Sequence, residues 1–156
     1  MSSHRIAPSA GRVNYSLMPK GPNGRALCRW CHRECPAPRM TFCSPGCVAE
    51  HKIRSDPRYA REAVFARDRG VCAVCRVDTL AVQLDLRAKR PKARAELCEV
   101  LGYPLDRVKR GALWEADHLR PVAEGGGECG LPGYQTLCVA CHRAKSAAQT
   151  TRRARA

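Results

Sequence analysis

Four closely spaced cysteine pairs constrain the fold of this chain more than any other feature of its sequence. Two such pairs together offer the four thiolates of a tetrahedral structural zinc site. The chain of 156 residues has two Phe, two Trp and four Tyr, so we expect a small hydrophobic core that needs bound metal ions or other cross-links for stability. We therefore predict two structural zinc ions, held by the pairs Cys28/Cys31, Cys43/Cys47, Cys72/Cys75 and Cys138/Cys141.

Disulfide bonds are the main alternative use of these cysteines. They need an oxidising compartment, and the N-terminal stretch MSSHRIAPSAGRVNYSLMPKG has no apolar run typical of an export signal. The total of eleven cysteines is also odd. We therefore expect a reduced, cytoplasmic protein without a membrane segment. A c-type haem, for which the spellings CRWCH and CVACH are also typical, is not expected in that compartment.

The first two pairs predict a local zinc finger, because eleven residues separate Cys31 from Cys43. Ser44 is a good N-cap and Pro45 a good first helical residue, so a helix is expected to run from there towards Arg54.

The last two pairs have no partners nearby, so we expect one site that closes across the 62 residues between Cys75 and Cys138. That closure would join a second cysteine knuckle to the start of the last helix. Asp117 and His118 lie between these pairs and His142 directly follows them. One zinc ion would therefore bring an acid and two imidazoles together.

Apolar spacing and breaker residues predict an α+β domain. Helices are expected from Asp56 to about Gly70, over about 79–90 and 91–101, and over about 139–149, with a strand over 113–116. A second segment ends in a flexible turn at 125–127, and the order is strand, loop, strand, helix. The predicted organisation is a flexible basic arm (1–27), a zinc finger-like knuckle (28–55), a main domain (56–150) with a helical insertion (about 78–110), and a basic tail (151–156).

The charge of the chain favours a polyanionic partner. It has 28 Lys and Arg against 14 Asp and Glu, a net charge of +14. The last 14 residues contain five basic residues and no acidic one. DNA, RNA or a ribosome would each account for this charge.

The motifs VFARDRGVCAVC, WEADHLRPVAEGGGECG and YQTLCVACHRAK resemble the HNH endonuclease family. The resemblance implies a zinc-stapled, treble-clef-like ββα-metal core that holds one divalent cation and cleaves phosphodiester bonds. From Cys28 onwards the chain is also similar to the HNH region of an animal annealing helicase, in which a cysteine finger precedes the HNH domain. The resemblance covers about residues 28–150 and is weakest over 76–110.

The resemblance assigns roles to three residues. His118 matches the general base that takes a proton from the attacking water, and Asp117 and His142 match the ligands of the catalytic cation. Adjacent side chains on a strand point to opposite faces, so Asp117 is expected to face the cation. Mg²⁺ or Mn²⁺ suits a carboxylate and phosphate oxygens, and Zn²⁺, Ni²⁺ or Co²⁺ are alternatives because His142 is a nitrogen ligand.

The sequence departs from the family at the middle Asn of the motif, where Gly133 stands. Gly has no side-chain amide to hold the loop that orients the base. Gln135, a backbone group or a water molecule are the candidates to replace it.

Structural roles are the alternatives for these residues. His142 as a fourth zinc ligand and His118 as an ordinary turn residue are the competing interpretations. The remaining histidines are expected to be exposed or packed in the finger, and the remaining cysteines to be spare thiols; they are His4, His32, His51, Cys35, Cys98 and Cys129.

Basic residues that follow His142 are predicted to contact phosphates beside the cut: Arg143, Lys145, Arg152 and Arg153. A solvated helix face is the alternative. The leading hypothesis is a metal-dependent DNA endonuclease. The others are a zinc-containing nucleic-acid-binding module without catalysis and an RNA- or ribosome-associated protein. The oligomeric state is not predicted.

Overall fold

The structure, a computed structural model, describes residues 13–155, with the side chain of Arg110 left out. The chain divides into two compact units, Met1–His51 and Lys52–Ala156, so the boundary falls a few residues before the predicted one at 55/56. Within the described residues, no helix is both long enough and apolar enough to cross a membrane.

The first unit contains more local structure than the sequence predicted. Residues 13–27 were expected to belong to a flexible arm, but they include the 3₁₀ helix η1 (Tyr15–Leu17) and a β-bridge between Lys20 and Ala26. Met18 is buried, and Leu27 pairs with Glu34. The start of the finger therefore includes residues from Val13 onwards, while residues 1–12 of the predicted arm lie outside the described residues.

Helices α1 (Pro45–Ser55) and α2 (Pro57–Asp68) begin where the sequence predicts. Ser44 Oγ accepts a hydrogen bond from the backbone N–H of Cys47 at 3.1 Å. Asp56 caps α2 by accepting from the backbone N–H groups of Arg58 and Tyr59. Arg69, with φ of 56°, ends α2 in the left-handed conformation.

The insertion contains three helices where the sequence predicted two. Helices α3 (Thr79–Ala88) and α4 (Pro91–Leu101) were expected, and α5 (Leu105–Arg110) was not. Six residues after a proline are too few to show a helical period. The three helices bury an apolar cluster with Leu113, which precedes β1, and a residue of the second strand of the sheet; its members include Leu86, Cys98, Val108, Leu113 and Leu137.

Arg94 ties the start of α4 to the end of α3. Its guanidinium donates to the carbonyl oxygens of Leu86, Arg87 and Lys89, each at 2.8 Å. These are charge-assisted bonds to carbonyl oxygens at the C-terminal end of α3, and the Leu86 oxygen also accepts the backbone N–H of Lys89 at 3.3 Å.

We predict that Arg94→Met lowers the free energy of unfolding of the second unit by about 1–2 kcal/mol, because these carbonyls lose a charged donor. Urea denaturation measures the change. Arg90→Met is the control, since the Arg90 side chain makes no capping hydrogen bond. Equal unfolding free energies for the two variants would contradict the prediction.

A two-stranded antiparallel sheet forms the centre of the second unit. Strand β1 (Trp114–His118) pairs with β2 (Tyr134–Cys138), with Asp117 opposite Gln135 and His118 opposite Tyr134. β1 lies slightly later than the predicted strand. The 3₁₀ helices η2 (Val122–Glu124) and η3 (Leu131–Gly133) lie between the strands.

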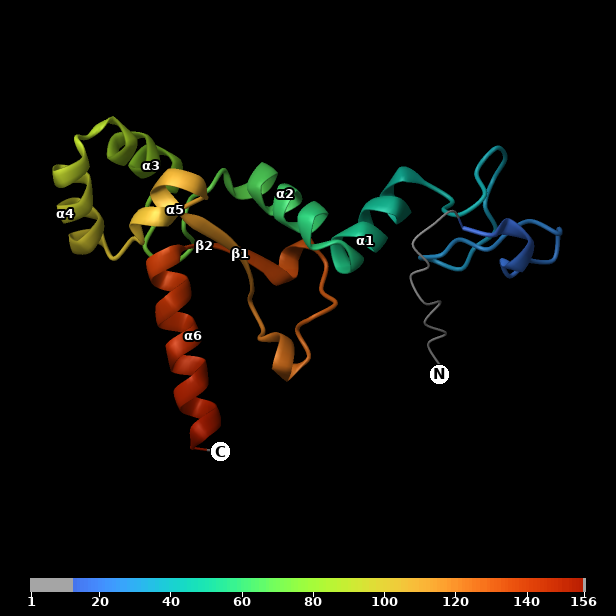
Figure 1. The fold of residues 1–156 in the computed structure, drawn as a ribbon. Coiled ribbons are helices and arrows are strands. Elements are labelled where there is room, and N and C mark those ends of the chain that lie inside the picture. The colour runs from blue at the N-terminus through green and yellow to red at the C-terminus, as the bar shows by residue number, and fades with distance from the viewer. Residues whose placement is uncertain (1–12, 156) are drawn as a thin grey trace. The chain divides into compact units, whose positions relative to one another are not determined.

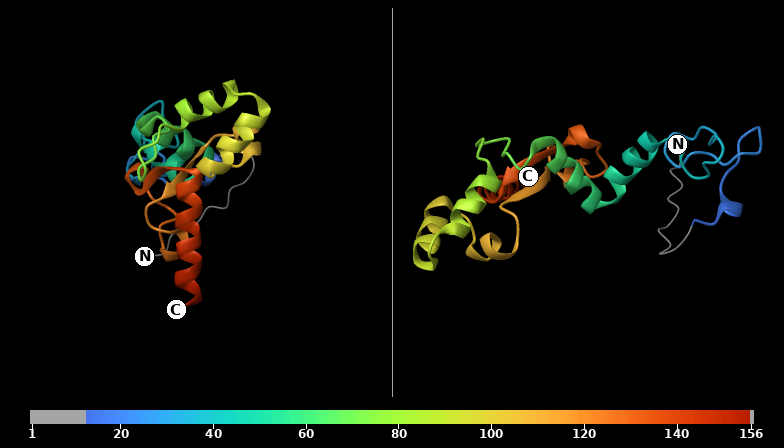
Figure 2. Two further views of the ribbon diagram at one scale, coloured as in Figure 1. Left: turned by 90° about the vertical axis from the view of Figure 1, so that its left-hand side faces the viewer. Right: turned by 90° about the horizontal axis from the view of Figure 1, so that it is seen from above.

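The last helix, α6 (Val139–Ala154), follows β2 without a loop and completes a ββα unit (Figure 1). It extends through most of the predicted basic tail, so residues 151–154 are helical. Its C-terminal half extends away from the sheet, as the left view of Figure 2 shows.

The two faces of the sheet contact different helices. Trp114 and Tyr134 pack with Ala60 and Val64 of α2, and Phe65 stacks on Trp114 with ring centroids 5.4 Å apart. Asp117, on the alternate face, contacts α6. The alternation of side chains along β1 thus separates an apolar face from a polar one.

Candidate functional site

The structure brings together the first predicted cysteine quartet. The Sγ atoms of Cys28, Cys31, Cys43 and Cys47 all lie within 4.8 Å of one another. Cys43 Sγ lies 3.4 Å from the Sγ atoms of both Cys31 and Cys47. A tetrahedral ion with Zn–S bonds of about 2.3 Å separates its sulfurs by about 3.8 Å, so the quartet fits zinc. The Arg33 side chain bonds to Cys31 and lowers the pKa of that thiol to about 6.

The second predicted quartet also forms, from residues far apart in the sequence. Cys72 and Cys75 lie in the turn after α2, while Cys138 and Cys141 lie at the start of α6, and all four Sγ atoms are within 4.8 Å. Cys75 Sγ and Cys138 Sγ are 3.7 Å apart. Burial opposes ionisation of Cys72, but backbone N–H groups, led by that of Cys138, lower its pKa to about 6. This quartet could hold a zinc ion that joins the knuckle to the ββα unit.

The other cysteines of the described chain lie outside both quartets. Cys35, Cys98 and Cys129 are free thiols, as the sequence suggested. His32 is exposed, and His51 packs against Phe42 with ring centroids 5.1 Å apart. His4 lies outside the described residues.

Asp117 is the centre of a polar cluster between β1, β2 and α6. Its Oδ2 accepts a hydrogen bond from Gln135 Nε2 at 2.9 Å and pairs with the ammonium group of Lys145. Its Oδ1 lies 3.9 Å from His142 Nε2. Lys145 also donates to the backbone carbonyl of His118.

The Asp117 and His142 atoms are placed suitably for a shared cation. Two ligand atoms that are each about 2.1 Å from one ion are separated by about 3–4 Å, and the observed 3.9 Å falls in that range. His142 and Lys145 share one face of α6 because residues three apart are neighbours on a helix. The helix therefore directs both side chains at the same carboxylate.

His118, the last residue of β1, points to the opposite face from Asp117. Its ring packs on Tyr134 with centroids 4.4 Å apart, and its Nε2 lies 3.3 Å from the carbonyl oxygen of Gly127. His118 also lines a cavity of about 350 Å³ with Arg54, Arg61 and Tyr134 among its other walls. Its ring thus has one nitrogen near a backbone acceptor.

The triple-glycine turn brings the Gly127 carbonyl to His118. A Cβ atom on Gly126 would lie 1.9 Å from the carbonyl oxygen of Arg120, which no side chain tolerates. Gly125 has φ of 87°, in the left-handed region that favours glycine. The turn therefore requires glycine at both positions.

Gly133 cannot be exchanged for the family's Asn without a local rearrangement. A Cβ atom at this position would lie 2.5 Å from Cys129 Cβ and 2.6 Å from its Sγ. Gln135, one candidate to replace the missing amide, bonds to Asp117 and not to His118. The Gly127 carbonyl is the backbone group that lies beside the His118 ring.

The predicted phosphate-contacting residues differ in their surroundings. Arg143, Arg152 and Arg153 are exposed on α6, whereas Lys145 is paired with Asp117. Sequence reasoning missed the pairing of Lys145 and the contact of Gln135. The three-residue spacing from His142 to Lys145 was the available signal, while the Gln135 contact depends on strand register.

The fold and this geometry define an α+β ββα module with a four-cysteine group that could hold zinc, preceded by a second such group. No family model matches the chain. The chain is 36% identical over 167 residues to the mouse DNA annealing helicase and endonuclease ZRANB3, covering 95% of this chain and 15% of that protein. The human ZRANB3 is 36% identical over 122 residues, 72% of this chain and 11% of that protein. The chain thus spans a small part of the length of these relatives.

A solved structure gives the domain-level comparison. The crystal structure of the human ZRANB3 HNH domain superposes with a TM-score of 0.52 and 32% identity, covering 66% of this chain and 96% of that domain. The chain therefore belongs to the HNH family and carries a nuclease-related HNH module. The resemblance expected from the sequence, both to the family and to the annealing helicase, is confirmed.

Proposed function

We propose that the chain is a metal-dependent endonuclease that hydrolyses phosphodiester bonds of DNA. The observation that carries the proposal is the 3.9 Å approach of His142 Nε2 to Asp117 Oδ1 beside the end of β1, where His118 is the next residue. The relatives are named as endonucleases that also anneal DNA, which supports DNA as the substrate.

Asp117 and His142 are the proposed cation ligands. A divalent cation bound there would polarise the scissile phosphate and stabilise the departing 3′-oxyanion. Mg²⁺ or Mn²⁺ suits the carboxylate, and Zn²⁺, Ni²⁺ or Co²⁺ remain alternatives with the imidazole. Gln135 and Lys145 hold the other carboxylate oxygen, so they fix the orientation of Asp117.

His118 is the proposed general base. With its proton on Nε2, the ring donates to the Gly127 carbonyl, and the lone pair of Nδ1 is free to take a proton from the attacking water. The Gly127 carbonyl thus performs the orienting role for which the family uses Asn. Cys129 occupies the space beside Gly133, so this sequence orients the base through the backbone of the glycine turn.

The exposed arginines of α6 are the proposed DNA contacts. Lys145 and Arg152 are seven residues apart, about two helical turns or 10 Å along one face. Arg153 lies next to this face, whereas Arg143, two residues before Lys145, lies on nearly the opposite side of α6. Such contacts position a phosphate backbone without reading the base sequence. The two four-cysteine groups are proposed to hold structural zinc.

Nicking of supercoiled plasmid tests the proposal. We expect the zinc-loaded chain to nick the plasmid only when Mg²⁺, Mn²⁺ or Ni²⁺ is added, and Asp117→Asn to lower the rate at least about 100-fold, because a cation ligand is lost. Asp106→Asn removes an exposed carboxylate of α5 and serves as the control. Retardation of DNA without nicking by the unmodified chain would instead indicate a non-catalytic binding module, and preferential retention of RNA an RNA-associated one.

A further inference from the structure

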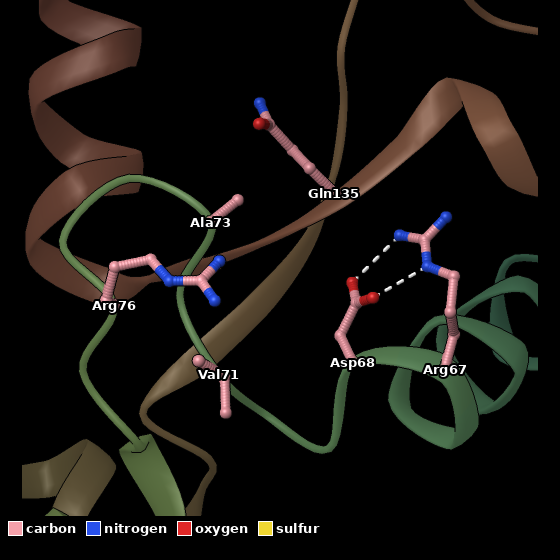
Figure 3. A pocket seen from close by; sticks show the side chains of 6 residues that line it. All are labelled: Arg67, Asp68, Val71, Ala73, Arg76 and Gln135. Carbon is pink, nitrogen blue, oxygen red and sulfur yellow. Dashed lines mark hydrogen bonds and ion pairs between the residues drawn. The ribbon is translucent and has the colours of Figure 1, made fainter.

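A second cavity lies beside the β2 edge, outside the predicted site. It measures about 370 Å³ and is lined by side chains from the end of α2, the cysteine knuckle and β2: Arg67, Asp68, Val71, Ala73, Arg76 and Gln135 (Figure 3). Ala73 donates its backbone N–H to the Thr136 carbonyl at 2.8 Å, so the knuckle is fixed against the strand.

Arg67 and Asp68 line one side of this cavity and bind each other and the neighbouring backbone. Arg67 pairs with Asp68 at 2.6 Å and also donates to the carbonyls of Leu131 and Tyr134. The Thr136 hydroxyl donates to Asp68 at 2.9 Å. The Arg67 guanidinium holds the pKa of Asp68 below its usual value. The charges of this pair therefore cancel, and its polar atoms are occupied.

Arg76 supplies the unbalanced positive charge of the cavity. It lies in the turn of the second knuckle, next to Cys75, and its guanidinium extends towards the space between Val71 and Ala73 (Figure 3). The residue is exposed and has φ of 63°, a left-handed backbone conformation that costs a residue with a side chain about 1–2 kcal/mol. Within the described chain, the structure gives its side chain no ion pair or hydrogen bond.

Gln135 connects this cavity to the proposed cleavage site. The same side chain lines the cavity and donates its amide N–H to Asp117 Oδ2 at 2.9 Å. The cavity that Arg76 lines therefore adjoins the proposed cleavage site through the Gln135 side chain.

We propose that Arg76 binds a backbone phosphate of the DNA strand close to the scissile phosphate, and that the cavity beside β2 is the phosphate-binding site. The inference rests on the proposed function for the location of the cut. A guanidinium donates two parallel hydrogen bonds to phosphate oxygens, which suits a lone arginine at an open cavity. Arg67 and Asp68 already use their polar atoms in hydrogen bonds to each other and to Thr136, so these atoms are not available to recognise a base.

Arg69 offers a matched control. It is also an exposed arginine in the left-handed conformation, with φ of 56°, and it lies outside the lining of the cavity. Arg76→Gln and Arg69→Gln therefore remove the same charge at the same backbone conformation. Arg76→Lys keeps the charge at position 76.

The experiment measures binding of the zinc-loaded chain to a fluorescent DNA duplex by anisotropy over a series of salt concentrations, without added Mg²⁺ or Mn²⁺. We expect Arg76→Gln to weaken binding about three- to tenfold and to lower the slope of log affinity against log salt by about 0.9, the value for one phosphate contact. Arg76→Lys is expected to restore the slope, and Arg69→Gln to bind like the unmodified chain. Zinc content and far-UV circular dichroism confirm that the variants are folded.

The outcomes separate this inference from the proposed function. Equal slopes of log affinity against log salt for Arg76→Gln and Arg69→Gln would overturn the proposed phosphate-binding site, whether or not the chain nicks plasmid. The predicted loss of slope in a chain that never nicks DNA would support the phosphate-binding site and overturn the proposed endonuclease activity. Failure of the unmodified chain to bind DNA would overturn both.

Discussion

Replacing His118 with Asn is expected to lower the rate of plasmid nicking by about 10²–10⁴-fold, the usual contribution of a general base. Asn has no basic nitrogen at neutral pH, so it cannot accept the proton of the attacking water. The affinity for DNA should change little, because His118 is assigned to proton transfer. Single-turnover nicking and anisotropy measured on the same preparation separate these two effects.

His32 provides a control within the same chain. It follows Cys31 in CRWCH as His142 follows Cys141 in CVACH, yet it is exposed and lies in the other unit. Its φ of 59° suits Asn, so His32→Asn should fold normally. Its nicking rate should match that of the unmodified chain. Nicking by His118→Asn at the same rate as His32→Asn would remove His118 from the proposed mechanism.

Replacing Cys138 with Ser is expected to unfold the second unit and to reduce the zinc content from two ions per chain to one. Structural zinc contributes about 10–16 kcal/mol in small domains, which equals or exceeds the stability of most of them, about 5–15 kcal/mol. The effect should be large because Cys138 is buried, lies 3.7 Å from Cys75 and caps α6. Elemental analysis and a thermal melt followed by circular dichroism measure both changes.

Cys129→Ser is the control for this loss. Cys129 is half-buried and lies outside both quartets, so two zinc ions and a cooperative melt should remain. A Cys138→Ser chain that keeps two zinc ions and the melting temperature of this control would show that the second quartet does not staple the unit.

Local chemistry accounts for the parts of the fold that were predicted correctly. Ser44 and Asp56 cap the starts of α1 and α2, because a side-chain oxygen binds the free N–H groups of a first turn wherever it occurs. Pro91 likewise begins α4. Helix α5 was missed because its six residues are stabilised by packing of Val108 against the core, a contact that local sequence does not encode.

In the candidate site, too, spacing within one helix could be predicted from the sequence, whereas contacts between residues far apart in the chain could not. The three-residue spacing of His142 and Lys145 is visible in the sequence, but their common partner is not. Asp117 meets them, and Gln135 as well, only through strand register and the docking of α6. The ordered segment at 15–27 was expected to be flexible, because its β-bridges connect residues whose pattern shows no strand period.

Side-chain types and cysteine spacing indicated which residues could bind a metal or take up a proton, and they indicated two four-sulfur groups. The packed structure was needed to show that Lys145 pairs with Asp117, that the Gly127 carbonyl lies beside His118, and that Arg76 lines a cavity next to Gln135. The difference arises because ligand identity depends on side-chain chemistry, which is local. Orientation depends on contacts between residues far apart in the chain, which exist only after the sheet, the knuckle and α6 have packed together.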